Sequence, residues 1–118
     1  MAEERYAACI ASANACAEAC DHCASKCLAQ SEVQSMARCI ALDVDCAEMC
    51  RLNAGFMARA SEFASDVCRL SARVCEACAA ECAKHPMDHC QACARACREC
   101  AAECLRVCDG MQQRSRAA

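Results

Sequence analysis

The spacing of its cysteines constrains this chain more than any other feature. Eighteen of the 118 residues are cysteine, and they fall into four groups in which neighbouring cysteines are three, four or seven residues apart. Those steps keep side chains on one face of an α-helix, so each group predicts one helix with a cysteine stripe along it. The groups are Cys9, Cys16, Cys20, Cys23 and Cys27; Cys39, Cys46 and Cys50; Cys68, Cys75, Cys78 and Cys82; and Cys90, Cys93, Cys97, Cys100, Cys104 and Cys108. Four stripes therefore predict four helices and an all-α fold.

The break between the first two groups places the ends of the first two helices. We expect the first helix over residues 3–29, and the second to begin at Ser31, whose side chain suits a helix cap. Asn53 and Met57 continue the cysteine stripe in the same rhythm. The second helix should therefore run past its last cysteine and through Gly55, which weakens a helix without necessarily ending it.

The third and fourth helices are bounded by a serine, a proline and a glycine. Ser61 is the expected cap of the third helix, which should end near His85 because Pro86 is tolerated best in a first helical turn. The fourth helix should run to about Asp109, where Gly110 supplies a left-handed stop. Four segments of similar length with short connections suit an antiparallel bundle. We therefore expect residues 1–118 to form one domain, an antiparallel four-helix bundle with a cysteine-lined core.

Charge and hydropathy exclude several classes of partner. The 13 basic and 16 acidic residues are interspersed. There is no basic tract for phosphates and no aromatic set for bases, so we expect no nucleic-acid partner. No stretch approaches about 20 uninterrupted apolar residues, so we expect no membrane span. The acidic residues 1–5 lack the pattern of an export signal, so we expect a cytoplasmic protein, where dense cysteine more often binds metal than forms disulfides.

Pairs of cysteines four residues apart can each hold a soft metal ion. On a helix, the Cβ atoms of such a pair lie about 5–6 Å apart. A near-linear sulfur–metal–sulfur unit with bonds of about 2.3 Å spans roughly 4.6 Å, so it fits without distorting the backbone. Soft thiolate ligands select Cu(I). We therefore predict that all eighteen cysteines bind Cu(I), on the order of one ion per thiol.

Charge favours Cu(I) over zinc. Each Cu(I) that enters replaces about one thiol proton, which leaves the interior close to neutral at any loading. A zinc ion bound by four thiolates carries a net charge of about −2, and several such centres would place that charge in a dry core at high cost. Buffering of zinc, or of soft metals in general, is the alternative that stays open.

Other interpretations of the cysteines fit the pattern less well. Cysteine can act as a small core hydrophobe, but valine or leucine would fill a core better and avoid oxidation. Cβ atoms four residues apart on a helix are too distant for a disulfide. A thiol–disulfide exchange enzyme needs an exposed, activated thiolate, usually on an α/β scaffold, and no strand pattern is present. We therefore expect no enzymatic activity and keep a redox protein as the lesser alternative.

One end of the expected bundle carries the few large apolar side chains. In an antiparallel bundle, the starts of the first and third helices meet the ends of the second and fourth. That end gathers Tyr6, Phe56, Met57 and Phe63. We interpret these four residues as an apolar plug that closes one end of the core.

The opposite end gathers side chains that can bind metal. Asp43 lies about one turn deeper, at the edge of its stripe, beneath Cys27, Met36, Cys39, Cys82, His85, Met87, His89 and Cys90. Imidazole and thioether bind Cu(I) more weakly than thiolate, which suits a site that passes ions inward. We therefore predict that His85, Met87 and Met36 line an entrance. The alternative is that both methionines fill gaps and the histidines are ordinary helix-end residues.

Several segments carry a family resemblance over nearly the whole chain. The first group reads CxxxCDxCxxxC, the second contains CxxxC, and the later groups read CRLSARVCEACAAECAKH and then MDHCQACARACRECAAEC. These segments resemble the bacterial copper storage proteins, and the lack of an export signal resembles their cytosolic subclass. The resemblance implies a homotetramer of bundles, Cu(I) held mainly by thiolates inside each bundle, and no enzymatic role. Copper ions, and proteins that deliver or accept them, are the expected partners.

The chain departs from an unbroken stripe at one position. Ser71 lies between Cys68 and Cys75, where a cysteine would fit the rhythm of the third group. A hydroxyl is a poorer Cu(I) ligand than a thiolate. The local arrangement of metal around Ser71 should therefore differ from the rest of the core.

Overall fold

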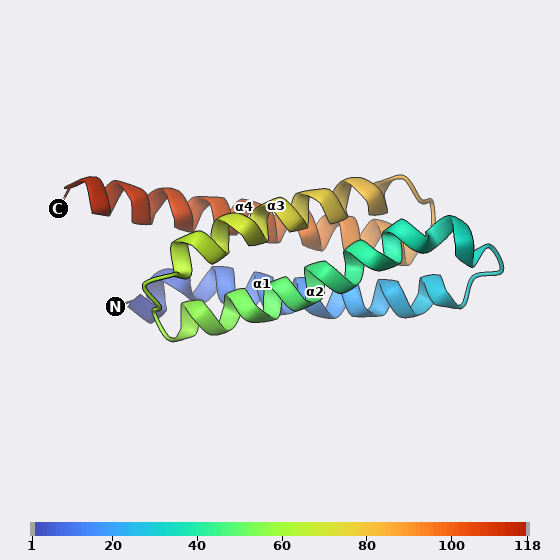
Figure 1. The fold of residues 1–118 in the computed structure, drawn as a ribbon, viewed down its shortest axis with the longest axis horizontal. Coiled ribbons are helices and arrows are strands. Elements are labelled where there is room, and N and C mark those ends of the chain that lie inside the picture. The colour runs from blue at the N-terminus through green and yellow to red at the C-terminus, as the bar shows by residue number, and fades with distance from the viewer. Residues whose placement is uncertain (1, 118) are drawn as a thin grey trace.

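Four α-helices account for most of residues 2–117, the part of the chain that this computed structural model describes, with side chains described for residues 4–108. They are rich in Ala, Glu and Arg, which have high helix propensity. One short 3-10 helix, η1, joins the first two (Figure 1). In chain order the elements are α1 (Ala2–Leu28), η1 (Val33–Met36), α2 (Ala37–Ala58), α3 (Ala64–Ala83) and α4 (Asp88–Ala117).

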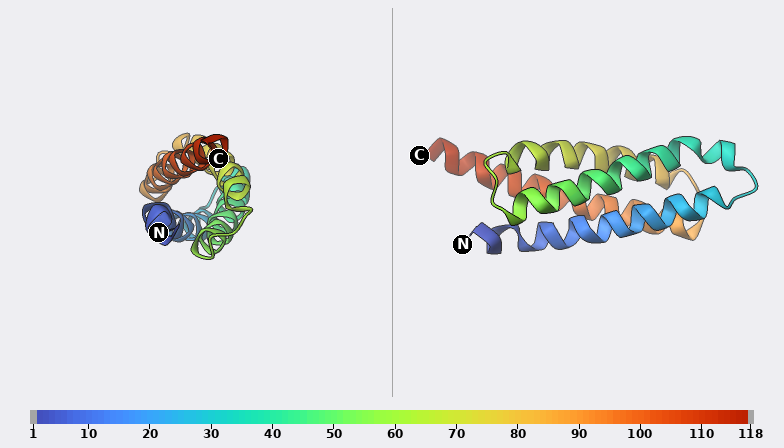
Figure 2. Two further views of the ribbon diagram at one scale, coloured as in Figure 1. Left: turned by 90° about the vertical axis from the view of Figure 1, so that its left-hand side faces the viewer. Right: turned by 60° about the horizontal axis from the view of Figure 1, so that its bottom comes forward.

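The helices pack side by side as an antiparallel bundle. Each packs against two neighbours, so that α1 contacts α2 and α4, and α3 contacts α2 and α4. Seen from one end, the four helices surround a common axis (Figure 2). The molecule is elongated, with extents of 55 × 20 × 18 Å. The predicted all-α, antiparallel four-helix bundle is confirmed.

The start of α2 differs from the prediction. Ser31 does not cap it, because the chain first forms η1 and α2 then begins at Ala37 without a side-chain cap. Instead, the Ser35 hydroxyl donates a hydrogen bond of 2.7 Å to the Glu32 carbonyl within the connection. The connection therefore satisfies its polar groups locally before α2 starts. The prediction that the helix passes through Gly55 is confirmed.

The start and end of α3 each lie slightly inside the predicted limits. The residue that precedes the helix is Phe63, and Ser61 lies two residues further back. The Ser61 hydroxyl accepts a hydrogen bond of 3.1 Å from the Phe63 amide, so it supports the turn before the helix rather than capping it. At the other end α3 stops at Ala83. His85 therefore lies in the connection to α4.

The end of α2 forms a Schellman motif without glycine. The Ser61 amide donates to the Phe56 carbonyl and the Ala60 amide donates to the Met57 carbonyl, each at 3.0 Å. This pattern requires a left-handed residue, and Ala60 has φ of 51°. An alanine in that conformation is strained because its Cβ approaches the following carbonyl oxygen.

The predicted stop at Gly110 is wrong. Helix α4 continues through Gly110 to Ala117 and extends past the ends of its neighbours (Figure 1). A glycine ends a helix only when it adopts a left-handed conformation, and none of the glycines in the described chain has positive φ. A glycine inside a helix costs about 1 kcal/mol relative to alanine, which a helix of 30 residues tolerates.

The core consists mainly of cysteine and alanine. All eighteen cysteines are buried, and alanines next to the stripes complete the packing between helices. At the end expected to be closed, Tyr6 and Met57 are buried and Phe56 is half-buried, in agreement with the predicted plug. Phe63 is 55% exposed, so its inclusion in the plug is wrong. No helix within residues 2–117 combines the length and apolarity that crossing a membrane requires.

Candidate metal centre

All eighteen cysteines are buried and line the interior of the bundle. Each is at most 1% exposed. Their burial follows from the sequence, because steps of three and four on every helix turn the same face toward the common axis. The four stripes thus meet along the bundle axis rather than in four separate sites. We call the resulting column of sulfur atoms the thiol file.

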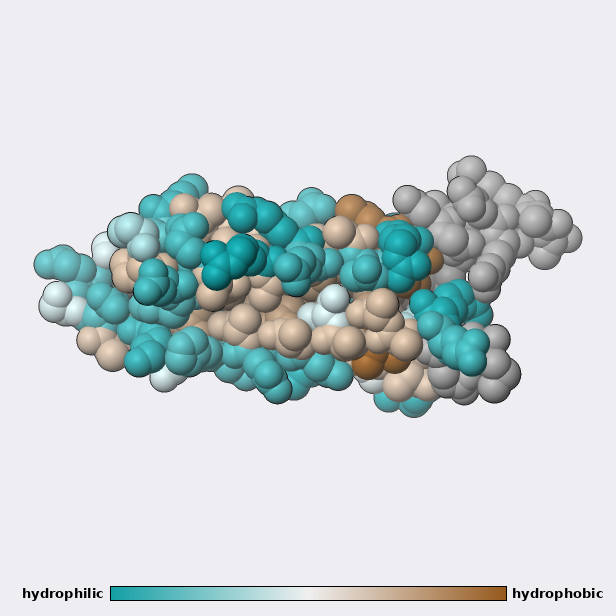
Figure 3. All heavy atoms as spheres, turned by 180° about the vertical axis from the view of Figure 1, so that it is seen from behind, coloured by the Kyte–Doolittle hydropathy of each residue, from teal (hydrophilic) through white to brown (hydrophobic). Residues whose placement is uncertain are grey.

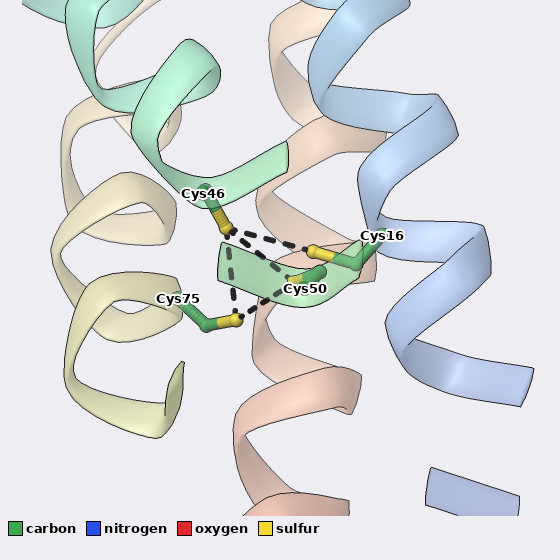
Figure 4. A group of neighbouring side chains, drawn as sticks. All are labelled: Cys16, Cys46, Cys50 and Cys75. Atoms are coloured by element: carbon green, nitrogen blue, oxygen red, sulfur yellow. Dashed lines mark hydrogen bonds between the residues drawn. The ribbon is translucent and has the colours of Figure 1, made fainter. Parts of the chain in front are cut away.

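The middle of the bundle shows how helices share their sulfur atoms. Cys46 of α2 lies 3.8 Å from Cys16 of α1 and 3.6 Å from Cys75 of α3, measured between Sγ atoms. Cys50, one turn along α2, lies 3.7 Å from Cys75 (Figure 4). These four sulfur atoms all lie within 4.8 Å of one another. One metal ion could therefore contact sulfur atoms from three helices.

The sulfur contacts continue from this group toward α4. Cys97 lies 3.6 Å from Cys16, 3.7 Å from Cys20 and 3.9 Å from Cys46. Cys93 in turn donates to Cys20 at 3.6 Å. Cys16, Cys20, Cys46 and Cys97 are thus each shared between two neighbouring ligand groups, so in this part of the core an ion could pass between groups without leaving thiol ligands.

The sulfur separations match the bonding of a small soft ion. In the file they range from 3.6 to 4.0 Å. Three sulfur atoms around one ion, with bonds of about 2.3 Å, lie about 4.0 Å apart, and two sulfur atoms in a line lie about 4.6 Å apart. Trigonal coordination therefore fits the present positions, and linear coordination requires only small side-chain rotations.

Burial favours the neutral, protonated form of two core thiols, Cys90 and Cys39. Removal from water raises the pKa of the Cys90 thiol to about 11 and that of the Cys39 thiol further. These thiols are protonated at neutral pH. A metal ion that binds them must release their protons, so its affinity rises with pH.

The structure places Asp43 inside the thiol file. The residue is fully buried, and its Oδ1 atom accepts hydrogen bonds from Cys78 at 3.3 Å, Cys82 at 3.4 Å and Cys93 at 3.3 Å. Burial raises the pKa of the carboxyl group to about 9, so it is neutral at pH 7 in the metal-free protein. A protonated carboxyl group surrounded by thiols leaves no uncompensated charge in the core.

The predicted entrance residues do not all face the thiols. Met36 is buried in the core cluster, and Met87 is half-buried and packs against it. His85 turns to Glu81, with 2.9 Å between Nε2 and a carboxylate oxygen. That hydrogen bond is the main reason why the pKa of Glu81 is lowered. The structure therefore brings both methionines to the core and ties His85 to an acid.

His89 is the histidine that contacts a thiol. Its Nε2 atom lies 3.5 Å from Sγ of Cys27, and Cys27 lies 3.8 Å from Cys90. Burial lowers the pKa of His89, and the positive charges of His22 and Lys26 lower it further. A neutral imidazole is the form that binds metal. Of the histidines, His89 is therefore placed best to meet an ion at the end of the file.

The closed end has a different polar layer. Asn53 is fully buried; its amide donates to Cys104 at 3.3 Å and accepts from Cys68 at 3.3 Å. Cys104 lies 3.6 Å from Cys9. The Ser71 hydroxyl is buried and makes no hydrogen bond within the structure. At this end, the file of thiols thus includes one amide and one hydroxyl.

Neither His89 nor Asn53 was predicted from the sequence to be a metal ligand. Both carried a usable signal, since His89 lies four residues before Cys93 and Asn53 lies three residues after Cys50. Those steps put them on the cysteine stripes. Glu81 carried a different signal, because it lies four residues before His85, the spacing of a helical side-chain pair.

A four-helix bundle whose interior is one file of thiols defines a class of soft-metal-binding bundles. The chain belongs to the copper storage protein family, and the model of that family matches residues 2–109. The resemblance predicted from the cysteine segments is thereby confirmed.

Individual relatives agree with this assignment. The chain is 47% identical to the cysteine-rich protein YhjQ of Bacillus subtilis over 83 residues, which cover 70% of this chain and 77% of that protein. It is similar to the Cu(I)-bound copper storage protein BsCsp3, with 44% identity, a TM-score of 0.85, and coverage of 88% of this chain and 98% of that one. A cytosolic copper storage protein of Streptomyces lividans, in a copper-loading structure with five coppers, is 36% identical with a TM-score of 0.88, over 92% and 95% of the chains.

Proposed function

We propose that this chain stores Cu(I) by binding many ions to the thiolates inside its bundle. The observation that carries the proposal is the set of eighteen buried thiols, most of which have a neighbouring sulfur atom 3.6–4.0 Å away. Soft thiolates favour Cu(I), and the separations suit two or three sulfur ligands per ion. Relatives that are named Cu(I)-bound and copper-loading support it.

The eighteen cysteines are the proposed ligands of the stored ions, and Asp43 is the proposed oxygen ligand within the file. Exchange of about one proton for each Cu(I) keeps the core near neutral as it fills. This neutrality is the reason for preferring Cu(I) to many zinc ions, each of which would add negative charge to the interior.

His85, Met87 and Met36 remain our proposed entrance residues, and we add His89. The contact between His89 and Cys27 puts an imidazole beside the outermost thiols. An ion bound there weakly could pass to Cys27 and Cys90, which hold it more strongly. In this proposal Met36 and Met87 are transient thioether ligands, and His85 acts after it leaves Glu81.

The cellular location, partners and oligomeric state of the protein are proposed from other observations. The matched Streptomyces lividans protein is named cytosolic, and reduced thiols suit that compartment. We propose a bacterial cytosolic store without catalytic activity, served by proteins that deliver or accept copper. We also propose a homotetramer, as the family resemblance implies, and the side chains of Val44, Leu52, Leu70 and Leu105, each more than 40% exposed, offer apolar surface for contacts between bundles. In addition, weakly hydrophobic residues form a lengthwise band on the face shown in Figure 3.

A titration of the reduced protein with Cu(I), against a competing chelator, tests the storage function. We expect tight uptake of about 18 ions per chain, on the order of one for each thiol. A sample with alkylated thiols is the control and should take up almost none. Saturation at four or five ions would indicate tetrathiolate sites and would refute a Cu(I) store.

A further inference from the structure

One oxygen atom in the core has an unusual set of neighbours. Oδ1 of Asp43, on α2, lies 3.3–3.4 Å from the sulfur atoms of Cys78 and Cys82 on α3 and of Cys93 on α4. The carboxylate thus faces three thiols from two other helices. All four side chains are fully buried, so the packing of the bundle fixes their positions.

The three oxygen–sulfur distances match those of a tetrahedral site with three sulfur ligands and one oxygen ligand. With metal–sulfur bonds of about 2.3 Å and a metal–oxygen bond of about 2.0 Å, such a site has oxygen–sulfur separations of about 3.5 Å and sulfur–sulfur separations of about 3.8 Å. The observed oxygen–sulfur distances are within about 0.2 Å of this value. The Cys78–Cys82 separation is 3.9 Å.

The ligand set favours a divalent ion of intermediate softness. Cu(I) is satisfied by two or three thiolates and uses a carboxylate oxygen only as a weaker additional ligand, whereas zinc accepts thiolate and carboxylate together in a tetrahedron. The outer atom of the carboxyl group, Oδ2, is 3.9 Å from the Cys39 thiol, a neighbour that could help orient the ligand.

We propose that Asp43, Cys78, Cys82 and Cys93 form a binding site for a single zinc-class divalent ion. The ion occupies the bundle when copper is scarce and leaves when Cu(I) takes the three thiolates. One such centre carries a net charge of about −2, the same as an ordinary four-cysteine zinc site. The charge argument against many zinc ions in this core does not apply to one.

This site shares three thiols with the proposed copper store, but the two proposals can be tested separately. Divalent binding requires only the four side chains around Asp43, while copper storage requires the whole file. The same preparation can therefore be titrated with Cu(I) and with a divalent ion, and failure of either proposal is visible separately.

The test is a titration of the reduced, metal-free protein with Co(II), a spectroscopic substitute for zinc. We expect one equivalent per chain, with thiolate charge-transfer bands and the visible d–d bands of a tetrahedral ion. Asp43→Asn should weaken binding by more than about tenfold, because it removes the anionic oxygen ligand. Asp45→Asn, on the exposed face of the same helix, is the matched control and should bind as the wild type does.

A second variant and a displacement experiment test the same site. Cys78→Ser removes a sulfur ligand from the neighbouring helix α3 and should weaken binding and reduce the charge-transfer intensity, even if Asp43→Asn folds poorly. Addition of Cu(I) to the Co(II) protein should abolish the d–d bands. Uptake of several Co(II) ions without a break at one equivalent, or wild-type affinity in Asp43→Asn, would overturn the proposal.

Discussion

Replacing Asp43 by asparagine should change how the stability of the metal-free protein depends on pH. Burial raises the pKa of this carboxyl group from 3.8 to about 9. Because the folded pKa lies above the unfolded one, its stabilising contribution is fully present below pH 3.8 and is lost as pH rises toward 9. Asparagine has a similar shape and no proton to lose, so its variant should not show this loss.

The size of the effect follows from the interval between the unfolded and the folded pKa of Asp43. Between about pH 5 and pH 8 the unfolded carboxyl is ionised while the folded one is neutral. The wild type should therefore lose about 1.4 kcal/mol of unfolding free energy per pH unit relative to Asp43→Asn. At pH 7 the accumulated loss is about 4 kcal/mol, a large part of the stability of an ordinary domain.

Chemical denaturation followed by far-UV circular dichroism, with reductant and chelator present, measures this difference. The unfolding free energies of the two proteins should diverge steadily from pH 5 to pH 8, with the variant the more stable at the upper end. Asp45→Asn provides the control for removal of an exposed acid on the same helix. A difference that stays constant across this range, or grows toward low pH, would show that Asp43 is ionised in the folded core.

Three further substitutions test other parts of the structure. His89→Ala should slow Cu(I) loading in stopped-flow measurements without changing capacity, since it removes the imidazole beside Cys27; loading at the wild-type rate would show that ions enter without His89. Ser71→Cys should raise Cu(I) capacity by about one ion, because the new thiol would join a file where the hydroxyl has no partner. Unchanged capacity would mean that this position does not reach the metal. Ala60→Gly should raise the unfolding free energy by up to about 1 kcal/mol by relieving the left-handed strain, and a lower melting temperature would contradict that account.

The cysteine pattern alone was enough to predict the helices and their inward faces. Steps of three, four and seven can be satisfied on one face only by a helix, and Gly55 was correctly placed inside α2. The helix ends were harder to predict. Ser31 and Gly110 carry the usual signals for a start and a stop, but each signal works only in a particular backbone conformation. That conformation depends on the route of the chain between helices, which local residue preferences do not determine.

The candidate site also has features that the sequence could predict and features that it could not. Spacing along each helix determined that eighteen thiols face the core, because a helical period relates sequence position directly to direction. Which thiols meet across the core depends on the rotation and stagger of four packed helices. Only the tertiary structure could therefore place Cys78, Cys82 and Cys93 around one oxygen of Asp43, or turn His85 to Glu81 while His89 meets Cys27. These contacts join residues up to 62 positions apart in the chain, and packing between helices, rather than periodicity within one, brings them together.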